Sequence, residues 1–115
     1  MKFNSQICTT REQSKRLLAL GLKKETADMR YYALYISTVD KWYNKEYPEV
    51  LYDGERINNH DIPAWSLHRL IEMALKDVLI CGISFVYNGE VYEKVIGIIE
   101  NQIHNELFPK QYLNF

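Results

Sequence analysis

The chain contains 115 residues, a length that corresponds to one compact domain. Hydrophobic residues make up 47%, charged residues 25% and aromatic residues 13%, and nine tyrosines supply most of the aromatic share. This composition excludes collagen, intrinsic disorder, a disulfide scaffold and a membrane protein. A domain of this size can bury a core without the help of disulfides or a metal.

The formal net charge of −1 argues against a strongly electropositive nucleic-acid-binding domain. The charge is nevertheless uneven, because seven basic and three acidic residues give residues 1–30 a charge of +4. Residues 31–115 carry seven basic and twelve acidic residues, a charge of −5. This polarity would direct an anionic partner to the N-terminal end, although a solvated helix face is the more common explanation.

Cys8 and Cys81 lie far apart in the sequence, each among apolar or small neighbours. Buried free thiols of a cytoplasmic protein are the first interpretation, and a single disulfide is the alternative. No apolar run has the length of a signal peptide or a membrane span, so we expect a cytoplasmic protein with no membrane partner.

The first predicted element is a helix over residues 10–20. Its start carries two overlapping capping boxes, Thr9 with Glu12 and Thr10 with Gln13. Gly21 ends the helix, because glycine readily adopts the left-handed conformation that closes a Schellman motif.

Residues 31–39 are rich in aromatic and β-branched side chains and predict a strand, with a helix over residues 26–43 as the alternative. On a strand, Tyr32, Leu34 and Ile36 line one face, and Tyr31, Ala33 and Tyr35 line the other. Residues 40–62 contain several turn signals and predict a long irregular connection, with a short edge strand at residues 50–52.

A second helix is predicted over residues 63–75, with Asp61 as its cap and Pro63 in its first turn. Four apolar residues at helical spacing form its expected buried stripe: Leu67, Leu70, Ile71 and Ala74. Three polar residues are expected to point outward: His68, Arg69 and Glu72.

Residues 78–87 are the most strand-like segment, and the Asn88-Gly89 pair after them is either a hairpin turn or a helix cap. Five apolar residues downstream recur at helical spacing: Tyr92, Ile96, Ile99, Ile103 and Leu107. This long pattern outweighs the dipeptide and predicts a helix over residues 91–107, followed by a tail at residues 111–113 that docks on the domain.

The order of these elements predicts a single α+β domain over residues 1–115. About three amphipathic helices would cover one face of a small, mostly antiparallel sheet.

Three segments also carry a resemblance: ICTTREQSKRLL at residues 7–18, LGL and ETADM at residues 20–22 and 25–29, and IPAWSL at residues 62–67. As a set they resemble a family of short uncharacterised proteins encoded in prophage-like and mobile regions of gut bacteria. The resemblance spans most of the chain but covers residues 40–60 poorly. It implies a small α+β fold and an origin on a mobile element, and it transfers no catalytic residue.

No catalytic or metal-binding pattern stands out. His60, His68 and His104 lack the spacing of metal ligands, and the cysteines do not form a ligand pair. There is no glycine-rich phosphate loop, and no serine lies in a nucleophile elbow. We therefore expect a protein that is not an enzyme and that needs neither a metal nor a cofactor.

The leading functional hypothesis is a protein-interaction module that binds a partner protein or a second copy of itself. Tyrosine and tryptophan are enriched at interfaces because an apolar ring and a polar tip both find partners there. The expected contact residues are Tyr31, Tyr35, Tyr43, Tyr47 and Trp65.

The alternative hypothesis is nucleic-acid binding by residues 9–30, where a helix, the Gly21-Leu22 turn and a following segment imitate a helix-turn-helix. The expected contact residues are Arg11, Lys15, Lys23, Lys24 and Arg30. Stacking of bases on the tyrosines is disfavoured, because acidic residues outnumber basic ones between residues 31 and 62.

Overall fold

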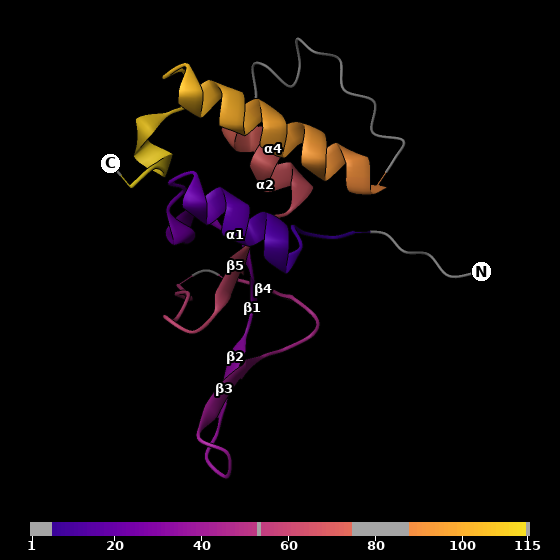
Figure 1. The fold of residues 1–115 in the computed structure, drawn as a ribbon, viewed down its shortest axis with the longest axis vertical. Helices are drawn as coiled ribbons and strands as arrows, with labels where there is room; N and C mark the ends of the chain where they lie inside the picture. The colour runs from indigo at the N-terminus through magenta and orange to yellow at the C-terminus, as the bar shows by residue number, and fades with distance from the viewer. Residues whose placement is uncertain (1–5, 53, 75–87, 115) are drawn as a thin grey trace, which may run out of the picture.

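The computed structural model describes residues 6–52, 54–74 and 88–114. These residues form an α+β fold, as predicted, in which the helices lie together at one end and the strands extend away from them (Figure 1). The helices are α1 (Arg11–Ala19), α2 (Leu67–Met73) and α4 (Asn88–His104), and two short 3-10 turns are η1 (Lys24–Thr26) and η2 (Lys110–Tyr112).

The strands form two antiparallel sheets. One has the order β4-β1-β5 and contains β1 (Met29–Tyr31), β4 (Glu49–Val50) and β5 (Ile62–Ala64). The other is a hairpin of β2 (Ala33–Ile36) and β3 (Lys41–Asn44).

Helix α1 confirms the first prediction almost to the residue. Of the two candidate capping boxes, the Thr10–Gln13 box forms, with Gln13 N donating to Thr10 Oγ1 at 3.1 Å and Thr10 N donating to Gln13 Oε1 at 3.0 Å. Gly21 adopts a φ of 105°, and Leu22 N donates to Leu17 O at 3.2 Å. These are the bonds of a Schellman motif, so local chemistry determines both ends of the helix.

The strand predicted over residues 31–39 is confirmed in part: Tyr32 divides it between two sheets, and residues 37–39 lie in the turn that follows β2. Residues before Tyr32 form β1, which pairs with β4 and β5, and residues after it form β2, which pairs with β3. The division lies where Ala33 N donates to the Asp61 carboxylate at 2.8 Å instead of to a strand. The helical alternative over residues 26–43 is therefore wrong.

The irregular connection predicted over residues 40–62 is also wrong, because it contains β3, β4 and the start of β5. Strand β3 forms because a tight turn, in which Asp40 adopts a φ of 50°, brings residues 41–44 opposite residues 33–36. The edge strand expected at residues 50–52 is present at Glu49–Val50 and does lie at the sheet edge.

The second helix begins later than predicted. Its cap is Ser66, whose Oγ accepts a hydrogen bond from Arg69 N at 3.2 Å, and Pro63 belongs instead to the edge strand β5. An edge strand tolerates proline because its outward side needs no N–H donor. The predicted stripe is confirmed, since Leu70 and Ala74 are buried and Leu67 and Ile71 pack against the same core.

Helix α4 begins at Asn88, so the helical interpretation of Asn88-Gly89 is confirmed and the hairpin is wrong. Tyr92, Ile96 and Ile99 are buried as predicted, but the helix ends at His104 and Leu107 is 72% exposed. The strand predicted over residues 78–87 and Cys81 lie outside the described residues.

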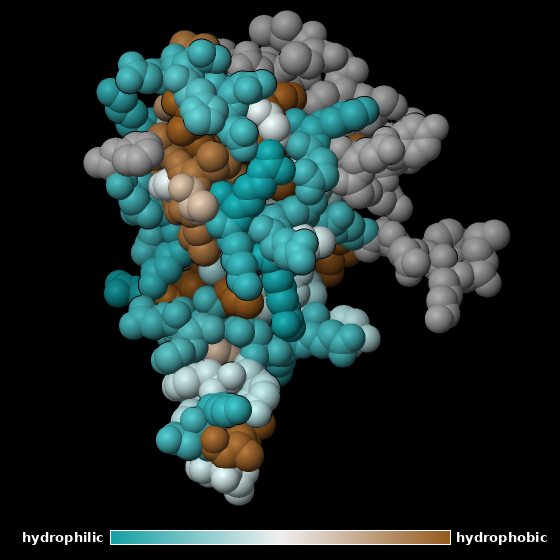
Figure 2. Space-filling view, viewed as in Figure 1, coloured by the Kyte–Doolittle hydropathy of each residue, from teal (hydrophilic) through white to brown (hydrophobic). Residues whose placement is uncertain are grey.

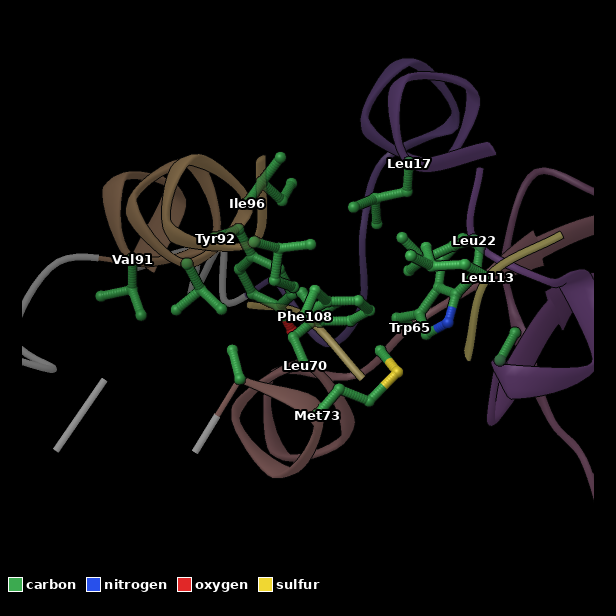
Figure 3. Close-up of a cluster of buried hydrophobic side chains, with 14 residues drawn as sticks. Leu17, Leu22, Trp65, Leu70, Met73, Val91, Tyr92, Ile96, Phe108 and Leu113 are labelled. Carbon is green, nitrogen blue, oxygen red and sulfur yellow. The ribbon is translucent and has the colours of Figure 1, made fainter. Parts of the chain in front are cut away.

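The core forms where the three helices meet the C-terminal tail (Figure 3). Leu17, Trp65, Leu70 and Ile96 are all 0% exposed. The predicted docking of the tail is confirmed, because Leu113 is 5% exposed in an isolated antiparallel bridge to Leu22. The C-terminal tail thus covers the core that the helices form.

Candidate functional site

The β2–β3 hairpin projects away from the helices and the three-stranded sheet (Figure 1). Figure 2 shows residues of intermediate hydropathy (pale) and hydrophobic residues (brown), together with some hydrophilic ones (teal), on this projection. Six large apolar side chains of the hairpin are each between 41% and 51% exposed: Leu34, Tyr35, Ile36, Val39, Trp42 and Tyr43. An apolar surface of this kind on a folded domain is a candidate contact site.

The register of the hairpin sorts these side chains onto two faces. The cross-strand pairs Leu34–Tyr43 and Tyr35–Trp42 are neighbours in the ladder, so they point to opposite faces. The ring centroids of Tyr35 and Trp42 lie 5.3 Å apart, and Trp42 stacks on His60 with centroids 4.0 Å apart and an interplanar angle of 6°. The aromatic face therefore rests partly on the body of the domain, whereas the Leu34–Tyr43 face does not share that support.

A buried carboxylate anchors the base of β2. The Asp61 side chain is 0% exposed and accepts hydrogen bonds from Ala33 N at 2.8 Å and Asn58 N at 3.0 Å. It also pairs with Arg30 Nη1 at 3.4 Å, and Arg30 Nη2 pairs with Glu55 Oε2 at 2.8 Å. Arg30 is thus an internal support of the hairpin.

Two further side chains hold the base of β3. Asn44 Nδ2 donates to the carbonyl oxygen of Tyr31 at 3.1 Å and to that of His60 at 2.9 Å. Arg11 Nη2 donates to the carbonyl oxygens of Asn44 at 3.3 Å and Lys45 at 2.7 Å. The polar groups at the base attach the hairpin to the domain, and the apolar side chains beyond them are left for contact.

The predicted interaction residues divide into two groups. Tyr35 and Tyr43 lie together on the hairpin, and Tyr47 is 76% exposed in the connection that follows β3. Tyr31 and Trp65, by contrast, are 8% and 0% exposed, so their prediction as surface residues is wrong.

Hydrogen bonds explain why these two aromatic residues are internal. Tyr31 Oη donates to Thr9 O at 2.9 Å, and Trp65 Nε1 donates to Thr26 Oγ1 at 3.0 Å. Their polar tips are satisfied inside the domain, which allows the large rings to be buried. The sequence alone does not distinguish the two cases, because an aromatic residue has the same ring and polar tip whether its hydrogen-bond partner lies inside the domain or on another molecule.

Four residues of the surface were missed by the sequence-based list of contacts: Leu34, Ile36, Val39 and Trp42. For Trp42 the available signal was the segment KWYN at residues 41–44, which continues the aromatic character of residues 31–36 beyond a turn, and for Leu34 and Ile36 it was their shared face of the predicted strand. The turn signals around residues 41–44 favoured a loop instead.

The structure does not assemble the predicted nucleic-acid contacts. After Gly21 the chain enters η1 and then β1, so the recognition helix of a helix-turn-helix is not formed in this stretch. Arg30 is buried among carboxylates, Arg11 bonds to the carbonyl oxygens at the hairpin base, and Lys24 Nζ donates to Asn59 Oδ1 at 3.2 Å. Lys15 is exposed on α1 and Lys23 is half-buried beyond its end.

The buried groups with perturbed pKa values are structural. Cys8 is a free, buried cysteine whose Sγ lies 3.7 Å from Tyr31 Oη. Burial raises the pKa of the Cys8 thiol and, together with the hydrogen bond to Cys8, that of Tyr31. A thiol with a raised pKa stays protonated near neutral pH, which makes it a poor nucleophile.

Among the residues the structure describes, no three His, Cys, Asp or Glu side chains converge on a point that would hold a metal ion. Within the same ranges, no helix combines the length and the apolar character needed to cross a bilayer. Comparisons with protein-family models, with curated proteins and with solved structures each returned no match to this chain.

Proposed function

We propose that this protein is a non-enzymatic protein-interaction module whose contact surface is the β2–β3 hairpin. The observation that carries the proposal is the group of six half-exposed apolar side chains on a hairpin held at its base by Asp61, Asn44 and Arg11. A two-stranded hairpin is marginally stable in water by itself. Anchoring one so that its apolar residues stay accessible is a typical arrangement for recognition.

The chemistry of the hairpin suits a protein partner. Trp42 and Tyr43 supply the large, rigid rings that dominate binding energy at protein interfaces. Lys41 and Lys45 border them, and Lys45 Nζ is already paired with Glu49 Oε1 at 2.9 Å. A contact with an apolar centre and a sparsely charged border fits a protein surface better than a phosphate backbone, which needs several cations.

The resemblance to proteins of prophage-like and mobile regions supports placing such a module on a mobile element. The contact surface on the hairpin is the same whatever the genomic setting of the protein.

Site-specific photo-crosslinking tests the proposal. A photoreactive amino acid replaces Tyr35, which is 48% exposed on the hairpin, in the full chain expressed in its native cells. The control carries the same group at Leu107, which is 72% exposed after α4. We expect discrete protein adducts from position 35 that position 107 does not form. Equal or absent adducts at the two positions would overturn the proposal.

A further inference from the structure

We infer that two copies of this chain pair through the outer edges of β2, antiparallel, to form a four-stranded sheet with the order β3-β2-β2-β3. The inference rests on the proposed function and names the partner of the hairpin as a second copy. It follows from a difference between the two edges of the hairpin, because the outer edge of β3 is protected against pairing with another strand and that of β2 is not.

The phase of the ladder determines which backbone groups face outward. Lys45 N donates to Tyr32 O at 2.8 Å, and hydrogen-bonded pairs recur at every second residue of an antiparallel ladder. Leu34 and Ile36 therefore direct their backbone groups to β3, while Ala33 and Tyr35 direct theirs away from it. The bond from Ala33 N to Asp61 Oδ1 agrees with this phase.

The outer edge of β3 is protected. Arg11 donates to the outward carbonyl oxygen of Asn44 and to that of Lys45. Lys41 begins the strand and Lys45 follows it, and lysines on an edge strand are a usual defence against pairing with another strand.

The outer edge of β2 lacks these defences beyond Ala33. The strand reads ALYI, without a charge or a proline. The outward N–H and C=O of Tyr35 make no hydrogen bond within the described residues. An uncharged edge with free donors and acceptors is a template for strand addition.

A second copy satisfies this edge through two-fold symmetry. Antiparallel pairing centred on Tyr35 places this residue opposite its own copy, with Leu34 of each chain opposite Ile36 of the other. No like charges meet, because β2 carries none. On one face, the Trp42–Tyr35 pair of each copy joins that of the other to make a continuous aromatic row.

The paired segment is short, since Asp61 already occupies the Ala33 N–H. An interface of one short strand lies at the small end of the size range, below about 1,200 Å² of total buried surface. The dimer is therefore weak and forms in a concentration-dependent way.

The first test uses sedimentation velocity and cysteine crosslinking on the full chain. The unmodified protein should change from monomer to dimer between about 1 µM and about 1 mM. Under mild oxidation, Tyr35→Cys should form at least about fivefold more covalent dimer than Tyr43→Cys, because the paired residues lie about 5.5 Å apart at position 35 and about 16 Å apart at position 43. The two positions are matched in exposure, at 48% and 46%. Equal yields would overturn the inference.

The second test exchanges charges across the pairing. Leu34→Glu and Ile36→Lys should each fold, since both positions are more than 40% exposed, and each alone should weaken dimerisation by about tenfold. Mixing the two variants should restore dimers, because glutamate then faces lysine across the strands. If mixing restores nothing while both variants remain folded by circular dichroism, the register is wrong and the inference falls.

The outcomes separate this inference from the proposed function. A purified chain that remains monomeric at every concentration overturns the β2 pairing. If position 35 still crosslinks to a different protein in cells, the proposed function stands. A chain that remains monomeric and crosslinks to nothing at position 35 overturns both.

Discussion

Substitution of Asp61 by alanine tests whether one buried carboxylate holds the hairpin on the domain. The Asp61 side chain is 0% exposed and accepts hydrogen bonds from Ala33 N, Asn58 N and Arg30 Nη1 at 2.8, 3.0 and 3.4 Å. Asp61→Ala removes all three acceptors at once. It leaves the buried Ala33 N–H without a partner and reduces the charge compensation of Arg30.

The expected loss follows from these contacts. A buried N–H without a partner costs about 1–3 kcal/mol, and a typical hydrogen bond contributes about 1 kcal/mol. Breaking a buried ion pair can cost about 3–5 kcal/mol, but Arg30 keeps Glu55 at 2.8 Å, which limits this part. We expect the free energy of unfolding to fall by about 3 kcal/mol, a large share of the about 5–15 kcal/mol of a typical domain.

Urea denaturation followed by circular dichroism measures this loss. With a slope of about 1–3 kcal/mol per molar urea, the midpoint should fall by about 1–3 M. Hydrogen exchange should also become faster over residues 33–36, where the anchor is lost. The control is Glu49→Gln, because Glu49 lies 3.9 Å from Arg30 Nε and is 38% exposed, so its loss should stay below about 1 kcal/mol. If Asp61→Ala costs no more than this control, the anchoring argument is refuted.

Three further predictions concern the body of the domain. Gly21→Ala should lower the free energy of unfolding by about 1–2 kcal/mol in thermal denaturation, because the φ of Gly21 is 105°. Gly97→Ala in α4 should instead raise it by about 0.5–1 kcal/mol, because a Cβ at this position meets open space. In a Cys81→Ser chain, Cys8 should react with a thiol reagent at pH 8 only as fast as the protein unfolds, because its side chain is 3% exposed and burial also raises the pKa of its thiol. Rapid labelling of the folded protein would contradict this. Burial raises the pKa of Tyr92 to about 12, above its ordinary value of 10.0, so its contribution to stability should be complete below pH 10 and lost as the pH rises to about 12. A chain with Tyr92→Phe should show a smaller alkaline loss in the same denaturation assay.

The sequence by itself determined the elements whose signals are local. The Thr10–Gln13 box and Gly21 define α1, and the long apolar repeat defines α4 against the competing Asn88-Gly89 dipeptide. These signals act between residues a few positions apart, so they are present in any fold that contains the segment. The α+β class followed from the order of such elements.

The tertiary structure decided what the aromatic residues do. Tyr31 and Tyr35 are four positions apart and similar in sequence context, yet one is buried against Thr9 and the other is exposed on the hairpin. The difference depends on Asp61, which lies 28 positions after Ala33 in the sequence. Its carboxylate accepts the hydrogen bond from Ala33 N at the point where the three-stranded sheet ends and the hairpin begins. Because contacts between distant residues select which face of a strand meets the core, the position of the interaction surface emerged only when the chain was folded.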